Sequence, residues 1–161
     1  MTDISTTIGN IKLDSPFLNA SGCWCYSIKD LEDMRHCQSG AYVSKTITMQ
    51  PRNGNREPRL FYDANLSVNS MGLPNMGYAA YTHYALTTKE REKPLFLSIS
   101  TMERKHTQQM MSMIAMTHLD TNVKGVEFNV SCPNIIGKGQ LGYDMEQLKD
   151  FLDLLSDSKL S

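Results

Sequence analysis

Several features that would mark a specialised class of protein are missing from this 161-residue sequence. No stretch approaches the roughly 18 consecutive apolar residues of a membrane-spanning helix, and the polar start, Met1 to Asn10, lacks the apolar centre of a secretory signal. Lys and Arg total 16 against 17 Asp and Glu, so there is no basic excess for nucleic acid. These absences favour a cytoplasmic globular protein of one domain, with neither a nucleic-acid nor a membrane partner.

Cysteine is also sparse, with four residues at positions 23, 25, 37 and 132. Cys23 and Cys25 form only a C-x-C pair, and no second pair or suitably spaced histidine completes a zinc site. Nothing else in the sequence points to an oxidising compartment, so we expect free thiols. No metal site is predicted.

Short apolar runs alternate with amphipathic segments along the chain. We interpret residues 16–21, 41–45, 94–100 and 126–130 as strands, and we expect helices after Ser27, over 77–86, over 107–118 and from Met145 to Leu155. Gly9-Asn10 predicts a hairpin turn, and the long polar segment 46–75 is interpreted as a loop that is either functional or disordered. Strands that alternate with helices predict an α/β fold with a parallel sheet.

Ligands of parallel α/β proteins bind beyond the carboxyl ends of the strands. The residues there are small, or they carry amides, one lysine and one thiol, which suits a flat polar ligand. They are Asn19, Ala20, Ser21, Gly22, Lys45, Thr46, Ser98, Ser100, Asn129, Ser131, Cys132, Pro133 and Asn134. The alternatives are that Cys132 is a small buried hydrophobe, Lys45 a solvated charge and the asparagines turn caps.

An ordered set of motifs resembles the dihydroorotate dehydrogenase family, and most closely its soluble, cysteine-dependent class 1A branch. The main motifs are Asn69-Ser-Met-Gly-Leu-Pro-Asn75, Asn129-Val-Ser-Cys-Pro-Asn134 and Gly137-Lys-Gly-Gln140. Asn19-Ala-Ser-Gly22, Val43-Ser-Lys-Thr46 and Gly54-Asn-Arg-Glu-Pro-Arg59 match in order and spacing. Thr101 and Leu66 stand where the family commonly has glycine, and we expect their side chains to crowd the rim.

The resemblance implies an FMN-dependent (β/α)8 TIM barrel that oxidises dihydroorotate to orotate in pyrimidine biosynthesis. Cys132 is the implied base that removes the C5 proton, while the hydride from C6 passes to the flavin, and fumarate is the usual acceptor in this branch. The implied substrate-binding residues are Lys45, Asn69, Met71, Gly72, Leu73, Asn129 and Asn134. The implied flavin-binding residues are Ala20, Ser21, Lys45, Thr46 and Asn129. Pro58 and Arg59 would belong to a loop near the site entrance.

Length limits what the chain can do alone, because such a barrel needs about 250 residues. We expect residues 1–161 to be the N-terminal half of one FMN-binding barrel domain, with the first four βα units and an N-terminal hairpin. Such a half requires its missing partner half, and a homodimer is usual in this branch. The alternatives are a non-catalytic half-barrel that serves as a structural or regulatory subunit, and a related flavoprotein that acts on another dihydropyrimidine.

Overall fold

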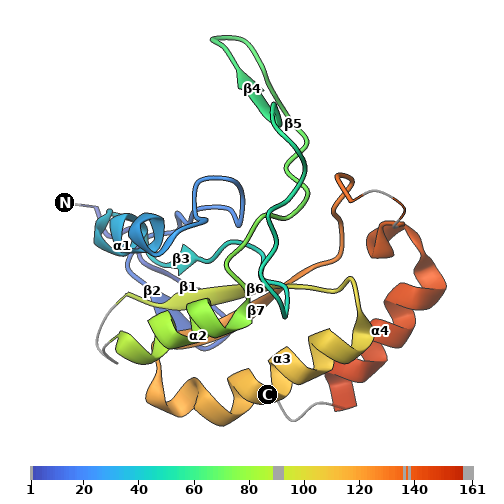
Figure 1. Ribbon diagram of the computed structural model, residues 1–161. Helices are drawn as coiled ribbons and strands as arrows, with labels where there is room; N and C mark the ends of the chain where they lie inside the picture. Colours follow the sequence, from blue (N-terminus) through green and yellow to red (C-terminus); the bar gives the residue numbers. More distant parts are fainter. Residues whose placement is uncertain (1, 89–92, 136, 138, 158–161) are drawn as a thin grey trace.

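Three short parallel strands form the central sheet of the structure, a computed structural model that describes residues 2–88, 93–135, 137 and 139–157 (Figure 1). In sheet order they are β3 (Tyr42–Val43), β6 (Leu95–Ser100) and β7 (Val123–Asn129). Tyr42 pairs with Leu95, and Ser98 pairs with Glu127. Because all three strands run in the same direction, their carboxyl ends meet at one edge of the sheet.

Helices connect and follow these strands. They are α1 (Ile28–His36), α2 (Tyr78–Thr87), α3 (Arg104–Thr117) and α4 (Met145–Asp157), with short 3-10 helices η1 (His118–Asp120) and η2 (Leu141–Tyr143). Figure 1 shows α2 and α3 against the same face of the sheet. The alternation of strands and helices predicted from the sequence is confirmed. No helix of the described residues has both the length and the hydrophobicity needed to cross a membrane.

The hydrophobic core lies between the sheet and its helices. Successive residues of β6 point to opposite faces, and Leu97 and Ile99 pack in one buried cluster with Tyr81 of α2 and with Met110 and Ile114 of α3. The polar residues of β6 face the other way. Met110 thus fills part of the core at this position of α3.

The first helix begins where the sequence predicts. The side chain of Ser27 accepts a hydrogen bond from the backbone of Asp30, and the Asp30 carboxylate accepts one from the backbone of Ser27. This reciprocal capping box satisfies two backbone donors at the helix start. Leu31 on the same helix is fully buried and attaches it to the core.

The predicted N-terminal hairpin is also present. Strands β1 (Thr6–Ile8) and β2 (Ile11–Leu13) pair antiparallel around the Gly9-Asn10 turn. Gly9 has a φ of 58°, which glycine adopts without the steric cost of a Cβ. Leu13 is the buried residue of this hairpin.

The prediction of a strand at residues 16–21 is wrong, because the structure has no strand there. The segment still lies beside β3: Gly40 donates its backbone N–H to Phe17 O at 2.9 Å. Further along, the side-chain amide of Asn19 replaces the strand ladder. Its Nδ2 donates to Val43 O at 2.9 Å, and its Oδ1 accepts from Val43 N at 2.8 Å. A side chain thus does the pairing that the sequence interpretation gave to the backbone.

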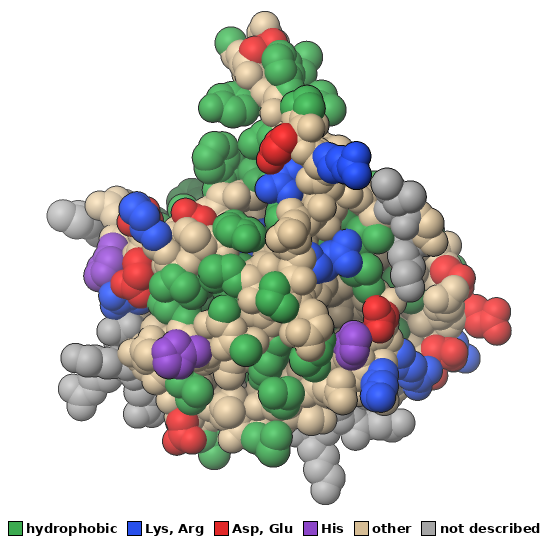
Figure 2. All heavy atoms as spheres, in the orientation of Figure 1, with side chains coloured by type: hydrophobic (Ala, Val, Ile, Leu, Met, Phe, Trp, Pro, Cys, Tyr) green, Lys and Arg blue, Asp and Glu red, His purple; other side chains and the backbone are tan. Residues whose placement is uncertain are grey.

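The segment 46–75, interpreted as a loop, contains a second hairpin. Strands β4 (Leu60–Tyr62) and β5 (Ser67–Asn69) pair antiparallel and project from the body of the molecule (Figure 1). Hydrophobic side chains gather on this projection (Figure 2), where Phe61, Tyr62 and Val68 are exposed. Leu66 is half exposed at the turn of the hairpin, so the expectation that it crowds the rim is wrong.

Candidate active site

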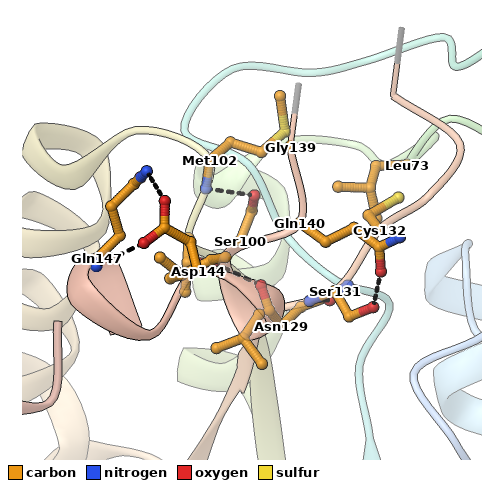
Figure 3. Close-up of a pocket in the computed structure, with 13 residues that line it drawn as sticks. Leu73, Ser100, Met102, Asn129, Ser131, Cys132, Gly139, Gln140, Asp144 and Gln147 are labelled. Atoms are coloured by element: carbon orange, nitrogen blue, oxygen red, sulfur yellow. Dashed lines mark hydrogen bonds between the residues drawn. The ribbon is translucent and has the colours of Figure 1, made fainter. Parts of the chain in front are cut away.

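A cavity of about 220 Å³ lies at the carboxyl ends of β6 and β7 (Figure 3). Asn129, Ser131 and Cys132 line it from the end of β7 and the loop that follows, and Asp144 and Gln147 line it from the start of α4. The cavity therefore lies where ligands of parallel α/β proteins bind. The sequence predicted this edge of the sheet.

Cys132 follows β7 directly, and its free thiol is partly buried at the cavity. Two hydrogen bonds of Ser131 hold this loop. The backbone N–H of Ser131 donates to Asn129 Oδ1 at 3.0 Å, and the hydroxyl of Ser131 donates to Gln140 Oε1. Figure 3 shows Cys132 and Leu73 at one end of the cavity. The neighbouring motif residue Lys138 lies outside the described residues.

Lys45 carries a charge but is only 6% exposed. Its Nζ donates to Ser21 O at 2.9 Å, the one acceptor found for it among the described residues. Burial lowers the pKa of Lys45, and negative charge on nearby groups, Cys25 and Cys132 among them, opposes that shift. Lys45 and Cys132 therefore lie close enough for their charges to interact. The alternative of a solvated surface lysine is wrong.

Hydrogen bonds join the ends of the three strand segments. Thr46 Oγ1 lies 3.1 Å from Ser98 Oγ, and Asn129 Nδ2 donates to Thr46 Oγ1 at 3.1 Å. Thr101, expected to crowd the rim, lines the cavity and donates its hydroxyl to Asn129 O at 2.7 Å. Its side chain therefore ties the end of β6 to the end of β7.

Two loops that are distant in sequence meet over this edge. Asn134 Nδ2 donates to Asn69 Oδ1 at 3.0 Å, so two of the predicted substrate-binding amides contact each other. Asn55 Nδ2 bridges the same loops, because it donates to Asn134 O at 3.0 Å and to Ser70 O at 2.9 Å. A Cβ on Gly72 would lie 2.5 Å from Asn55 Oδ1, so only glycine fits beneath this bridge.

The turn at 71–73 has an unusual division of its backbone groups. Gly72 and Leu73 are buried with φ values of 72° and 55°. The carbonyl of Met71 accepts from Asn55 N, and that of Leu73 accepts from Asn75 Nδ2. For the N–H groups of residues 71–73, in contrast, the described residues provide no acceptor. Buried backbone donors are rarely left without a partner, so this turn is suited to an anionic ligand.

The remaining predicted residues have structural contacts. Ala20 is exposed, and its carbonyl accepts from Cys25 Sγ at 3.5 Å. Arg59 Nε pairs with Glu57 at 2.8 Å, and its Nη1 donates to the carbonyl of Asn55 at 3.2 Å. Arg59 therefore braces its own loop, and Pro58 lies exposed within that loop.

The thiols differ strongly in their surroundings. All four cysteines are free, as expected. Burial raises the pKa of Cys25 to about 12, whereas a hydrogen bond with Ser39 lowers the pKa of the exposed Cys37. Within the part of the chain that the structure describes, no cluster of three or more His, Cys, Asp or Glu side chains is arranged to hold a metal ion.

Sequence reasoning missed three polar residues of the site. Asn75 closes one of the quoted motifs, but no site role was given to it; it is buried, and its side chain bonds to three backbone groups around it. Asn55 lies in the quoted motif Gly54-Asn-Arg-Glu-Pro-Arg59, but no site role was given to it. Glu127, a charge inside a predicted strand, was the one irregularity that could have been noticed.

Comparisons with known proteins identify the family of this chain. The family profile described as dihydroorotate dehydrogenase matches residues 3–159. The chain is 41% identical over 154 residues to "Dihydroorotate dehydrogenase A (fumarate)" of Lactococcus lactis subsp. cremoris, covering 92% of this chain and 48% of the relative. It is 40% identical over 150 residues to "Dihydroorotate dehydrogenase (fumarate)" of Trypanosoma brucei brucei, covering 91% and 47%.

A solved structure shares the fold. The dihydroorotate dehydrogenase of Eimeria tenella, crystallised with ferulenol, matches with a TM-score of 0.64 and 18% identity, covering 98% of this chain and 46% of that one. At this identity the likeness shows the fold alone. The chain spans about half the length of the curated relatives that it matches.

Proposed function

Since this chain belongs to the dihydroorotate dehydrogenase family, we propose that its protein oxidises dihydroorotate to orotate in pyrimidine biosynthesis, with FMN as cofactor and fumarate as electron acceptor. The observation that carries this proposal is the turn at 71–73, whose three N–H groups have no acceptor among the described residues. This turn lies beside the paired amides of Asn69 and Asn134 and lines the cavity of Cys132 through Leu73.

The substrate has a carboxylate and a planar ring edge with alternating donors and acceptors. We assign the carboxylate to the backbone of Met71, Gly72 and Leu73, because hydrogen bonds to an anion are about twice as strong as neutral ones. The ring would be held by the carboxamides of Asn69, Asn129 and Asn134, together with Lys45. Each carboxamide offers both a donor and an acceptor, which is what such a ring edge needs.

The residues at the strand ends also fit a flavin. Lys45 has donor capacity left at its Nζ, since a single acceptor is found among the described residues, and burial keeps it from water. Ala20, Ser21, Thr46 and Asn129 would complete the contact surface. When bound, FMN supplies a two-electron acceptor for the hydride that leaves the substrate.

The part of Cys132 in this reaction is that of a general base. A thiolate accepts the C5 proton, and the nearby positive charge of Lys45 attracts that thiolate. The contacts of Ser131 hold the loop so that the thiol remains at the cavity. Proton transfer by a positioned base contributes about 10²- to 10⁴-fold to a rate.

The test is anaerobic flavin reduction by dihydroorotate in the protein that carries this chain. Bleaching of the flavin by dihydroorotate supports the proposal, and no bleaching contradicts it. Cys132→Ala should bind orotate like the unmodified protein and reduce the flavin at least about 100-fold more slowly. Cys37→Ala is the matched control, since Cys37 lies exposed at the end of α1, and it should react normally. Bleaching by another dihydropyrimidine alone would favour the related flavoprotein, and no response to any would favour a non-catalytic subunit.

We also propose that residues 1–161 form the first half of one (β/α)8 barrel domain. The parallel order β3-β6-β7, with the site at the carboxyl ends of the strands, supports this arrangement. The exposed apolar side chains of the β4–β5 hairpin support a homodimer, which sedimentation of Phe61→Ser against the unmodified protein would test. The four free thiols support a cytoplasmic location.

A further inference from the structure

Glu127 is an exposed carboxylate on β7, two residues before Asn129. Alternate residues of a strand point to the same face, so Glu127 shares the face of the candidate site. Its register partner on β6 is Ser98, whose side chain is completely buried. Ser98 Oγ donates to Glu127 Oε1 at 2.6 Å, a length typical of a hydroxyl bonded to a carboxylate.

A chain of hydrogen bonds leads from Glu127 to the candidate site, and only one order of donors and acceptors is possible along it. A carboxylate only accepts, so the single hydroxyl proton of Ser98 is used on Glu127. Ser98 Oγ can then only accept from Thr46, which lies 3.1 Å away. Thr46 Oγ1 in turn accepts from Asn129 Nδ2 at 3.1 Å. Ser98 and Thr46 are 0% and 1% exposed, so water does not offer them other partners.

We propose that Glu127 is a positioning residue that sets the orientation of the Asn129 carboxamide through Ser98 and Thr46. The inference rests on the proposed function for its catalytic consequence, but not for its geometry. The chain of bonds fixes Nδ2 of Asn129 toward Thr46, which leaves Oδ1 on the Ser131 N–H at 3.0 Å. Glu127 therefore also holds the loop that carries Cys132.

Removing the carboxylate of Glu127 removes the acceptor that fixes the order of donors and acceptors along this chain of hydrogen bonds. Without an acceptor at position 127, Ser98 can donate to Thr46, which frees the Thr46 hydroxyl proton to point at Asn129. The orientation of the Asn129 carboxamide is then no longer fixed from this side, and a carboxamide that turned its oxygen toward Thr46 would bring Nδ2 against the Ser131 N–H. Two donors would then face each other, so the loop after β7 would lose one of its contacts.

The first experiment compares variants by kinetics in the protein that carries this chain. Glu127→Leu should lower the rate of flavin reduction by dihydroorotate at least tenfold, while Glu127→Gln, which keeps an oxygen acceptor for Ser98, should recover most of that loss. Ser98→Ala should act like Glu127→Leu, and the double variant should be no worse than either single one, because one chain of bonds is broken at two points. Additive losses would overturn the inference. Glu146→Leu, at an exposed glutamate of α4, is the matched control.

The second experiment needs no activity. The side-chain amide signals of Asn129 are identified by NMR through their loss in Asn129→Asp, and their hydrogen exchange is measured in the protein that carries this chain. Glu127→Leu should shift both signals and speed exchange at least tenfold, while Glu146→Leu should change neither. Unchanged signals in Glu127→Leu overturn the inference. If dihydroorotate does not reduce the flavin but the signals respond, the proposed function fails and the positioning of Asn129 by Glu127 stands.

Discussion

The buried side chain of Asn75 gives the sharpest stability prediction. It is 1% exposed, its Oδ1 accepts from the backbone N–H of Thr48 at 3.1 Å and of Gly77 at 2.9 Å, and its Nδ2 donates to Leu73 O at 3.0 Å. Asn75→Ala removes these three bonds, together with the contact between Nδ2 and Thr48 Oγ1 at 2.9 Å, and leaves three backbone groups without a partner. At about 1 kcal/mol for each group, the free energy of unfolding should fall by about 3 kcal/mol.

The assay is urea denaturation followed by tryptophan fluorescence and circular dichroism. Asn75→Ala should lower the midpoint without changing the slope, since the surface exposed on unfolding stays the same. Asn65→Ala is the matched control, because Asn65 is exposed at the turn of the β4–β5 hairpin and should cost less than about 0.5 kcal/mol.

A second variant separates the two sides of the Asn75 carboxamide. Asn75→Asp keeps an oxygen for Thr48 N and Gly77 N but places another opposite the carbonyl of Leu73. We expect a loss of unfolding free energy between those of the control and of Asn75→Ala. We also expect weaker orotate binding, because Leu73 belongs to the turn at 71–73, to which we assign the substrate carboxylate. Asn75→Ala within about 1 kcal/mol of the unmodified chain would refute the reasoning.

Three further predictions concern the site and the thiols. Gly72→Ala should destabilise the chain by about 2 kcal/mol and weaken orotate binding, measured by denaturation and titration, because its φ of 72° and the nearby Asn55 exclude a Cβ. In alkylation followed by mass spectrometry at pH 8, Cys37 should react first and Cys25 last. Ser39 lowers the pKa of Cys37, while burial raises the pKa of Cys25 to about 12, so that only about one Cys25 thiol in 10⁴ is ionised. The carboxamide of orotate should bind at least tenfold more weakly than orotate in a competition titration, because its NH₂ group would face the N–H groups of the turn.

Sequence periodicity predicted the parts of the fold that depend on local patterns. The cap at Ser27, the alternation along β6 and the positions of the helices follow from burial and hydrogen bonding within a few residues. The segment 16–21 was harder, because its apolar pattern fits a strand whether the ladder is made by backbone or by a side chain. Only the position of Val43, twenty-four residues later, decides that the Asn19 carboxamide makes the pairing.

The site was predictable where motifs exist and unpredictable where contacts are long-range. From the quoted motifs and the predicted strands we expected Lys45, Asn129 and Cys132 at one edge of the sheet. Nothing in the sequence announces that Asn55 reaches Asn134, which is 79 residues away. The same holds for Glu127, whose importance depends on the register between β6 and β7 rather than on any neighbour in sequence.

The division of backbone groups in the turn at 71–73 supports our assignment of the substrate carboxylate to this turn. Its carbonyl groups accept hydrogen bonds from Asn55, Arg52 and Asn75, so the protein itself uses the acceptors of the turn. The N–H groups remain, so a ligand that approaches them must offer acceptor atoms, and a carboxylate offers two of them with a negative charge. Under the proposed function, these three residues favour a carboxylate without contacting it, because they decide which half of each peptide group is left for the ligand.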